Sequence, residues 1–268
     1  MKAIFDRHVI DLEKFNPDQD NRAFLYGDGL FETIIFFNGQ IRYLQDHYER
    51  ITEGCNMLSL VLPEYFNLDY LARQLPALIR NNQLSGTVRI KLLVWRKSGG
   101  LYEPTRMEAH HLILTSKAED RIGQDIRRVG FSTRIFNHPT PWSAYKTQSS
   151  LPYVLAGIEK KEKKLDDIII TDSPGNISEL LYSNIFWIKN DKFYTPSLET
   201  GCIRGVMRTC LIRKLKESGF SLQEILAGRD ILLDADYVFS ANVSGLRPVT
   251  GIEDHIFNEY PDLRLILP

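Results

Sequence analysis

Three places in the sequence carry groups that could do chemistry. Lys146 follows the irregular segment 137–142, whose two prolines argue against a regular helix or a central strand. A lysine that is partly desolvated at such a place has a lowered pKa and becomes nucleophilic. Arg50 lies on a predicted helix and brings a guanidinium group. Another predicted helix begins near Gly205, after a small and flexible run, and the unpaired backbone N–H groups at its start suit a phosphate.

None of these features indicates a function alone, because most lysines and arginines lie on the surface and every helix has an N-terminus. Other chemistries find no support. The histidines show no HxxxH or HExxH spacing for a metal, and no GxSxG marks a serine nucleophile. Gly27-Asp28-Gly29 lacks the third glycine of a dinucleotide fingerprint. We therefore expect no metal site, no serine triad and no dinucleotide site.

The composition is that of an ordinary globular protein with a sizeable core. Of its 268 residues, 43% are hydrophobic and 25% are charged, and 33 Lys and Arg against 34 Asp and Glu give a net charge of -1. This balance gives no electrostatic reason to expect nucleic acid or an anionic membrane as a partner. Three scattered cysteines indicate reduced thiols, and neither a signal peptide nor a membrane span is visible. We expect a cytoplasmic protein.

Hydrophobic periodicity and turn residues divide the first half into strands and helices. A hairpin is expected over 30–37 and 40–44, because Asn38-Gly39 between these β-branched and aromatic segments suits a type I′ turn. The rest of this half is expected to hold helices at 45–60 and 70–81, the second bent or interrupted near Pro76, and strands at 87–95 and 111–116.

The second half is expected to hold strands at 126–133, 167–171, 237–240 and 246–249, helices at 151–165 and 204–219, and a hairpin of 181–188 with 192–195. The charge run 159–164 is typical of a solvated helical face with i,i+4 pairs such as Glu159–Lys163. Both halves mix strands and helices. The sequence therefore predicts an α/β or α+β protein of two domains. We place an N-terminal domain at 1–116, a polar linker at 117–125 and a C-terminal domain at 126–268 that carries Lys146.

Four sequence blocks, by their order and spacing, resemble the class IV aminotransferases, which are fold type IV enzymes that use pyridoxal 5′-phosphate (PLP). This family includes branched-chain aminotransferase, D-amino acid aminotransferase and aminodeoxychorismate lyase. The resemblance covers the chain from Tyr26 to about Val249. The blocks are Tyr26-Gly27-Asp28-Gly29-Leu30-Phe31-Glu32, His47-Tyr48-Glu49-Arg50, Ile177-Ser178-Glu179 with Ser183-Asn184-Ile185-Phe186, and Thr195-Pro196 with Gly205-Val206-Met207-Arg208.

The resemblance implies a role for several residues. Lys146 would hold PLP as a Schiff base and then move a proton on the substrate. Glu179 would face the pyridine nitrogen, and its negative charge would keep that nitrogen protonated. Arg50 would bind the cofactor phosphate through its paired N–H donors. The helix start at Gly205, Val206 and Met207 would complete the phosphate site. Asn242 falls where many relatives have a phosphate-binding threonine, and its amide would take that role.

Three departures from the family's pattern bear on the reaction. Ile35 stands where branched-chain enzymes often have an arginine, and Leu151 stands where they have a tyrosine that binds the phenolic oxygen of PLP. The loop 96–103 lacks the Arg and His pair with which D-amino acid enzymes hold the substrate carboxylate. Its Gly99-Gly100 pair and the short chain are closer to the lyase.

We therefore expect a PLP-dependent enzyme that acts on the amino group of a small, amino acid-like substrate. There is a slight preference for aminodeoxychorismate lyase, which releases 4-aminobenzoate and pyruvate in folate synthesis. A branched-chain or D-amino acid aminotransferase is the alternative, and a non-catalytic binding protein that retains the fold is a second one. The resemblance also implies a homodimer. The residues leave open the substrate's side chain, its stereochemistry, its carboxylate-binding group and the donor to the phenolic oxygen.

Overall fold

The structure is a computed structural model that describes residues 1–118 and 124–257, so the middle of the expected linker, 119–123, lies outside the described residues. The chain forms two compact units, Met1–Asp120 with Tyr145–Ser149 and Arg121–Ala144 with Ser150–Pro268. The division differs from the expected one at Lys146, whose segment groups with the first unit. The reason is that this segment pairs with a strand of that unit.

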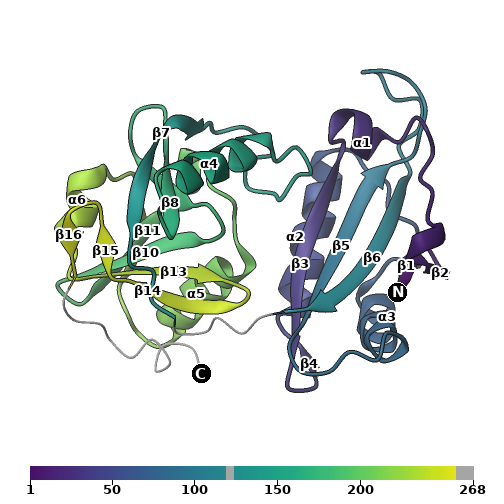
Figure 1. Ribbon diagram of the computed structural model, residues 1–268, viewed down its shortest axis with the longest axis horizontal. Coiled ribbons are helices and arrows are strands. Elements are labelled where there is room, and N and C mark those ends of the chain that lie inside the picture. Colours follow the sequence, from purple (N-terminus) through teal and green to yellow (C-terminus); the bar gives the residue numbers. More distant parts are fainter. Residues whose placement is uncertain (119–123, 258–268) are drawn as a thin grey trace. The chain divides into compact units, whose positions relative to one another are not determined.

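The first unit is built on a six-stranded antiparallel sheet in the order β2-β1-β6-β5-β3-β4 (Figure 1). Its strands are β1 (Lys2–Phe5), β2 (His8–Asp11), β3 (Gly29–Phe37), β4 (Gln40–Ile41), β5 (Val88–Arg96) and β6 (Ala109–Lys117). The helices are α1 (Arg22–Tyr26), α2 (Leu44–Met57) and α3 (Leu68–Asn81), with a 3₁₀ turn at Leu12–Lys14. Pro76 lies inside α3, which continues past it without interruption.

The expected β3–β4 hairpin is confirmed. Phe37 pairs with Gln40, and Asn38 and Gly39 both have positive φ values, 49° and 80°. This is the backbone that a type I′ turn requires and that the Asn-Gly pair accepts without steric cost. The second strand ends earlier than expected, at Ile41, because α2 already begins at Leu44.

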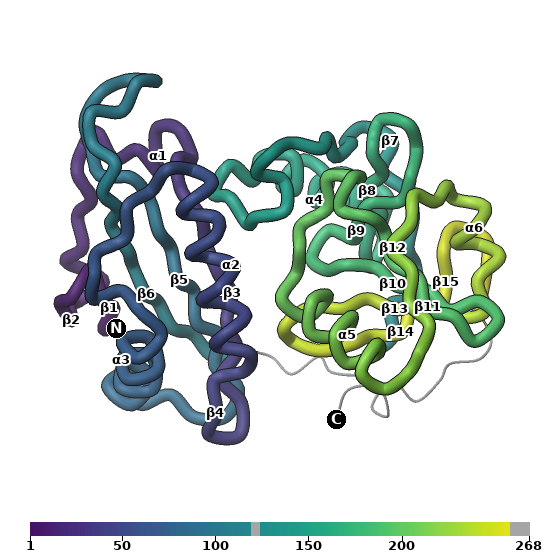
Figure 2. The backbone as a smooth tube through the Cα atoms, turned by 180° about the vertical axis from the view of Figure 1, so that it is seen from behind, coloured from purple at the N-terminus to yellow at the C-terminus, as the bar shows by residue number. Residues whose placement is uncertain are grey.

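The second unit contains two five-stranded sheets, ordered β12-β11-β10-β13-β14 and β16-β15-β7-β8-β9. Figure 2 traces the backbone through these elements. Its strands are β7 (Val129–Asn137), β8 (Asp167–Asp172), β9 (Ile177–Leu180), β10 (Asn184–Lys189), β11 (Lys192–Pro196), β12 (Leu222–Ile225), β13 (Tyr237–Asn242), β14 (Gly245–Val249), β15 (Gly251–Ile252) and β16 (His255–Ile256). The helices are α4 (Leu151–Glu162), α5 (Val206–Glu217) and α6 (Arg229–Leu233), with a 3₁₀ turn at Leu198–Thr200. The fold class is therefore the predicted mixture of strands and helices.

The expectation that the charge run at the end of α4 is solvated is wrong for Glu159. The pair with Lys163 exists, at 2.7 Å, but Glu159 is fully buried. Its carboxylate accepts hydrogen bonds from the Ser132 hydroxyl and from the backbone and side chain of Thr133. These residues lie where the pairing of β7 with β8 is irregular, between Phe131 and Phe136. Glu159 thus accepts hydrogen bonds from groups of β7 at the place where its regular pairing with β8 is interrupted.

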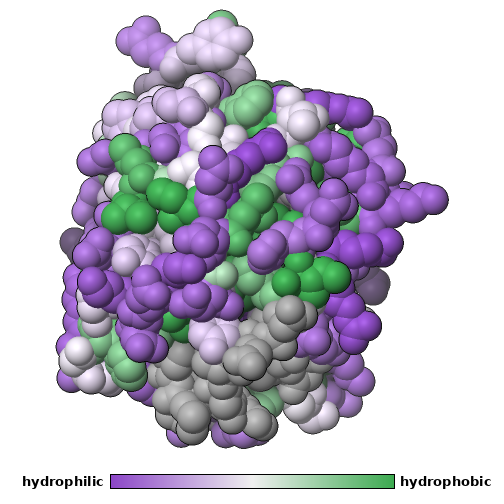
Figure 3. Space-filling view, turned by 90° about the vertical axis from the view of Figure 1, so that its left-hand side faces the viewer, coloured by the Kyte–Doolittle hydropathy of each residue, from purple (hydrophilic) through white to green (hydrophobic). Residues whose placement is uncertain are grey.

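The surface is mixed. Hydrophilic residues dominate the face shown in Figure 3, and hydrophobic residues lie in small groups between them. One helix departs from this pattern, because α4 exposes Leu151, Val154, Leu155 and Ile158 at i, i+3, i+4 and i+7. This spacing places the four side chains on one face of the helix.

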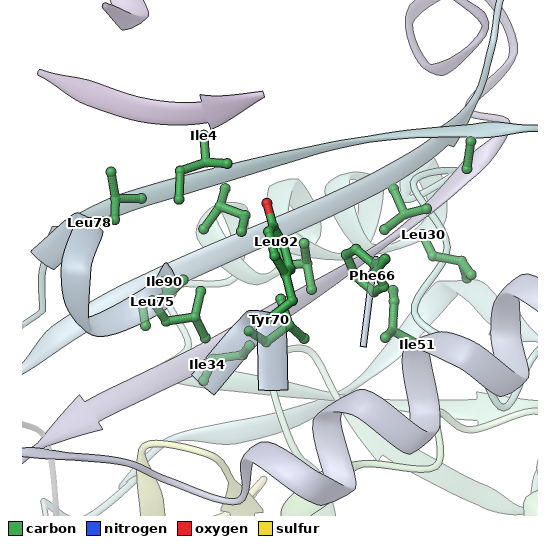
Figure 4. Close-up of a cluster of buried hydrophobic side chains, with 14 of the residues drawn as sticks. Ile4, Leu30, Ile34, Ile51, Phe66, Tyr70, Leu75, Leu78, Ile90 and Leu92 are labelled. Carbon is green, nitrogen blue, oxygen red and sulfur yellow. The ribbon is translucent and has the colours of Figure 1, made fainter. Parts of the chain in front are cut away.

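The core of the first unit lies between its sheet and the helices α2 and α3. Alternate residues of β5, among them Ile90 and Leu92, are buried, while Arg89 and Lys91 between them are exposed. Figure 4 shows Ile90 beside Leu75 of α3, and Ile51 of α2 beside Phe66 in the same cluster. This packing fixes α2 against β3, and both elements carry residues of the candidate site.

Candidate active site

Lys146 lies on the segment Tyr145–Ser149, which pairs with the start of β3. The Phe31 N–H donates to the Lys146 carbonyl and the Gln148 N–H donates to the Gly29 carbonyl, each over 2.9 Å. Leu30 and Thr147 form an antiparallel bridge. The Lys146 Nζ lies 4.8 Å from the centre of the Phe31 ring, in a cation–π arrangement. The structure therefore holds the backbone of this lysine against a strand and its amine over an aromatic ring.

The glycines of the first sequence block make this pairing possible. A Cβ at Gly29 would lie 2.4 Å from the Val94 carbonyl oxygen and 2.9 Å from the Gln148 amide nitrogen. Gly27 has a φ of 64° and lies against Ser149. Gln148 also donates its side-chain amide to the carbonyls of Leu30 and Val94. A larger residue at Gly29 would press on the backbone of β5 and on the Gln148 amide, and one at Gly27 would press on the backbone of Ser149 in the lysine segment.

Arg50 and Glu32 form a buried bidentate ion pair between α2 and β3. The Arg50 Nε donates to Glu32 Oε1 over 2.7 Å and Nη2 donates to Oε2 over 2.5 Å. His47 lies one helical turn earlier, and its Nδ1 is 2.7 Å from Glu32 Oε2. Burial alone would raise the pKa of Glu32, but the Arg50 charge and the His47 hydrogen bond outweigh it and lower that pKa to about 2. Glu32 is thus a fixed anion that orients the guanidinium.

Asp28, in the same sequence block, binds two buried arginines. The Arg22 Nε lies 2.8 Å and the Arg96 Nε 2.9 Å from Asp28 Oδ2. Arg22 also donates through Nη1 to the carbonyls of Gly99, Gly100 and Leu101. The Gly-Gly loop is therefore held by its backbone, and Arg22 and Arg96 have structural partners.

Glu179 lies on β9 and is 3% exposed. Its Oε1 accepts a hydrogen bond from the Tyr153 hydroxyl at 2.7 Å and from the Asn137 amide at 3.0 Å. The Ile203 N–H lies 3.4 Å from Oε1 and 3.3 Å from Oε2. Burial and the negative charge of Glu179 raise the pKa of Tyr153, so its hydroxyl stays protonated. Donors from α4, β7 and the loop before α5 therefore converge on one carboxylate.

The start of α5 is fixed by Asn184. The Asn184 amide donates to the Ile203 carbonyl over 2.8 Å, and a Cβ at Gly205 would lie 2.0 Å from Asn184 Oδ1. Gly205 is the N-cap of α5 and makes no side-chain cap. The N–H groups of Val206 and Met207 at this helix start carry the positive end of the helix dipole. The third and fourth sequence blocks thus meet where β10 contacts the start of α5.

Asn242 is engaged in its own turn at the end of β13. Its side-chain oxygen accepts from the Ser244 N–H over 2.9 Å, and its nitrogen donates to the Tyr182 carbonyl over 3.2 Å. These bonds give the amide a structural role. Its binding to a phosphate stays a prediction, and this geometry adds no support to it.

Four residues that contact the predicted site residues received no role in the sequence analysis. Glu32 contacts Arg50, His47 contacts Glu32, and Tyr153 and Asn137 contact Glu179. Glu32 and His47 stand inside the first two blocks, and their motif positions could have indicated them. Tyr153 and Asn137 stand outside every block. Tyr153 lies two residues after Leu151, where a tyrosine was expected and missing. Only the fold shows that its hydroxyl reaches Glu179.

We compared the chain with known protein families to identify the class of protein to which this fold and these residues belong. Residues 29–252 match the family model described as "Amino-transferase class IV". The chain therefore belongs to the class IV aminotransferase family, and it is an enzyme of that aminotransferase and lyase family.

Individual relatives extend over most of the chain. An aminodeoxychorismate lyase of Vibrio harveyi is 28% identical over 246 residues, which cover 87% of this chain and 86% of the relative. A putative branched-chain-amino-acid aminotransferase of Methanocaldococcus jannaschii is 24% identical and covers 96% and 90%. The crystal structure of the branched-chain aminotransferase of Thermoproteus uzoniensis with norvaline has a TM-score of 0.90, 22% identity and covers 99% and 92%. This last likeness shows the fold. In the described residues, no helix is both long and apolar enough to cross a membrane.

Proposed function

We propose that this enzyme binds PLP covalently through Lys146 and acts on the amino group of a small amino acid-like substrate. The observation that carries this proposal is the pairing of the Lys146 segment with β3 in a chain of the class IV family. The donor set suits the cofactor. The first unit holds an amine over an aromatic ring. The second unit holds a buried carboxylate, which accepts hydrogen bonds from Tyr153, Asn137 and Ile203, and an uncapped helix start at Gly205.

When bound, PLP withdraws electrons from the bonds at the amine-bearing carbon of the substrate. The residues of this chain then have separate tasks. Lys146, as an amine base, would remove the proton from that carbon and pass it to the departing enolpyruvate, which becomes pyruvate. Glu179, as a buried anion, would stabilise a proton on the ring nitrogen. Arg50 and the N–H groups of Val206 and Met207 would bind the phosphate.

We infer that the reaction is the lyase reaction, in which the amine-bearing ring carbon of aminodeoxychorismate loses its proton and the C–O bond to the enolpyruvyl group breaks. The products are 4-aminobenzoate and pyruvate. The Gly99-Gly100 loop supports this choice, as does the lyase relative from Vibrio harveyi. Amino acid transamination, of the branched-chain or D-amino acid type, is the second candidate, because the relative from Methanocaldococcus jannaschii bears that name.

The cofactor is tested by borohydride reduction of the protein with added PLP, followed by peptide mass spectrometry. Wild-type protein is expected to carry a reduced pyridoxyl group on Lys146, and Lys146→Ala is expected to carry none. Lys161→Ala, on the exposed surface of α4, is the matched control and should label like wild type. A colourless wild-type protein that borohydride leaves unlabelled would favour the non-catalytic binding protein.

The reaction is tested by assaying pyruvate release from aminodeoxychorismate beside a panel of amino donors with 2-oxoglutarate. Pyruvate and 4-aminobenzoate in equal amounts support the lyase. Pyridoxyl labelling of Lys146 without pyruvate release, together with transfer from an amino acid, would establish an aminotransferase instead.

We further propose that the enzyme is a homodimer in the cytoplasm. The exposed apolar face of α4 supports association, because burying Leu151, Val154, Leu155 and Ile158 in a partner would remove their surface from water. Light scattering after gel filtration is expected to give twice the chain mass, and Ile158→Asp is expected to lower it. The three cysteines are buried and reduced, which suits the cytoplasm, and cell fractionation tests the location.

A further inference from the structure

We propose that Tyr153 is a positioning residue, whose hydroxyl acts with the Asn137 amide to hold the Glu179 carboxylate ionised and in one orientation. This inference rests on the proposed function, which assigns that carboxylate to the ring nitrogen of PLP. It adds two residues, from α4 and β7, that none of the sequence blocks contains.

The geometry singles out the hydroxyl of Tyr153. The ring of Tyr153 packs in a small cluster with Ala156, Ile168 and Ile170. A phenylalanine ring would make the same apolar contacts. The hydroxyl instead makes a 2.7 Å bond to Glu179 Oε1, which is shorter than the bonds from the Asn137 amide and the Ile203 N–H. Hydrogen bonds to a charged group are stronger than those between neutral groups. Packing therefore explains the ring of Tyr153 but not its hydroxyl group, which binds Glu179.

Asn137 connects the carboxylate on β9 to β7, which is separated from β9 by β8 in the same sheet. Its amide nitrogen donates both to Glu179 Oε1 and, over 2.9 Å, to the hydroxyl of Ser178. Ser178 in turn donates to the Thr200 carbonyl in the loop before α5. The carboxylate is thus part of a buried network, in which removing one donor changes the orientation and the basicity of the group that remains.

The sign of the effect follows from proton affinity. Donors to a carboxylate stabilise its ionised form, and an ionised carboxylate favours the protonated form of a pyridine beside it. If Tyr153 loses its hydroxyl, Glu179 becomes more basic and competes for that proton. Tyr153→Phe should therefore lower the pH at which the ring nitrogen loses its proton, by about one unit, and weaken PLP binding about tenfold.

The experiment uses full-length protein with ¹⁵N-labelled PLP. The nitrogen chemical shift reports the ring proton across a pH series, and absorbance titration gives the PLP affinity. The wild type is first reduced with borohydride. If Lys146 is not labelled, the proposed function itself fails. If Lys146 is labelled, the variants test this inference alone.

Tyr194→Phe is the matched control, because this tyrosine belongs to the same unit and stacks on Trp187. It should behave as wild type. Asn137→Ser, which removes the second donor, should shift both readouts in the same direction as Tyr153→Phe. It also provides the test if thermal melting shows that Tyr153→Phe does not fold. A folded Tyr153→Phe, or in its place a folded Asn137→Ser, with wild-type nitrogen titration and PLP affinity would overturn the inference.

Discussion

At the scale of single residues, the room around the Cα atom decides whether a glycine can be replaced by a larger residue. Gly201 and Gly219 have almost the same left-handed backbone, with φ values of 79° and 80°. A Cβ at Gly201 would lie 2.7 Å from the His138 carbonyl group, whereas a Cβ at Gly219 would meet nothing within 4 Å. The two positions therefore separate backbone strain from steric contact.

Gly219→Ala is expected to lower the free energy of unfolding by about 1 kcal/mol, since only the left-handed conformation opposes the side chain. Gly201→Ala should cost about 1–3 kcal/mol more, because the backbone of the 138–139 segment must move. Urea denaturation of both variants measures the difference. Equal losses would contradict the contact at Gly201. The loop after Gly201 carries Ile203, so Gly201→Ala should also weaken PLP binding.

Residue types and spacing predicted Lys146, Glu179, Arg50 and Gly205 only through the resemblance. The reason is physical. A pattern shows which residues could do chemistry, but Tyr153 reaches Glu179 across 26 positions of sequence. Contacts of that kind depend on how α4 packs on β7 and β8, which no local pattern contains.

At the scale of secondary-structure elements, one ion pair joins α2 to β3. Glu32 is 1% exposed and Arg50 is 8% exposed, so neither charge is well solvated. Removing one partner of a buried pair leaves the other charge uncompensated, which costs far more than the loss of an exposed pair.

Glu32→Gln is therefore expected to lower the free energy of unfolding by about 3 kcal/mol. Glu49→Gln, on the exposed face of α2, should lower it by less than about 1 kcal/mol. Chemical denaturation compares the two. A loss at Glu32 no larger than that at Glu49 would show that the buried pair does not hold the helix.

Long periodic elements were predictable, and short ones were not. The two hairpins, α2, α3 and the central strands follow from apolar spacing and from the Asn-Gly and Asn-Asp turns. The strands β1, β2, β9, β12, β15 and β16 and the helices α1 and α6 were missed, because segments of two to five residues carry too few positions for a period. Glu159 was misread because its charge run looks solvated, while its partners lie on β7.

At the scale of the whole molecule, a buried histidine sets the response to mild acid. His111 is fully buried and lies 3.1 Å from the Tyr70 hydroxyl. Burial lowers the pKa of His111 from 6.5 to about 4, against the opposing charge of Asp6. Between these values the unfolded chain binds a proton that the folded chain does not. Stability is therefore fully present above pH 6.5 and falls as the pH drops toward 4.

His111→Gln should reduce this pH dependence. Between about pH 7 and pH 5 the wild type is expected to lose roughly 1–2 kcal/mol more stability than the variant. Urea midpoints across this range measure it, with His8→Gln, an exposed histidine, as control. Glu32 and Glu159, with pKa values lowered from 4.5 to about 2, lose their contributions only below pH 4.5. An unchanged slope in His111→Gln would contradict the assignment.

We expected two domains because strands and helices are mixed in both halves of the sequence, and we placed Lys146 in the second domain, whereas its segment groups with the first unit. Position 146 follows the linker by more than twenty residues, so counting along the chain assigns it to the C-terminal domain. The five residues 145–149 instead pair with β3 of the first unit, through two backbone hydrogen bonds and an isolated bridge.

The Gly-Gly loop has a consequence for how this enzyme could diversify. Arg22 holds the loop through the carbonyls of residues 99–101, which every amino acid possesses. Leu101 and Tyr102 are 74% and 91% exposed, so their side chains take little part in folding. Substitution of these two side chains should therefore leave the backbone of the loop unchanged and cost almost no stability. The two positions can thus acquire side chains that bind new ligands.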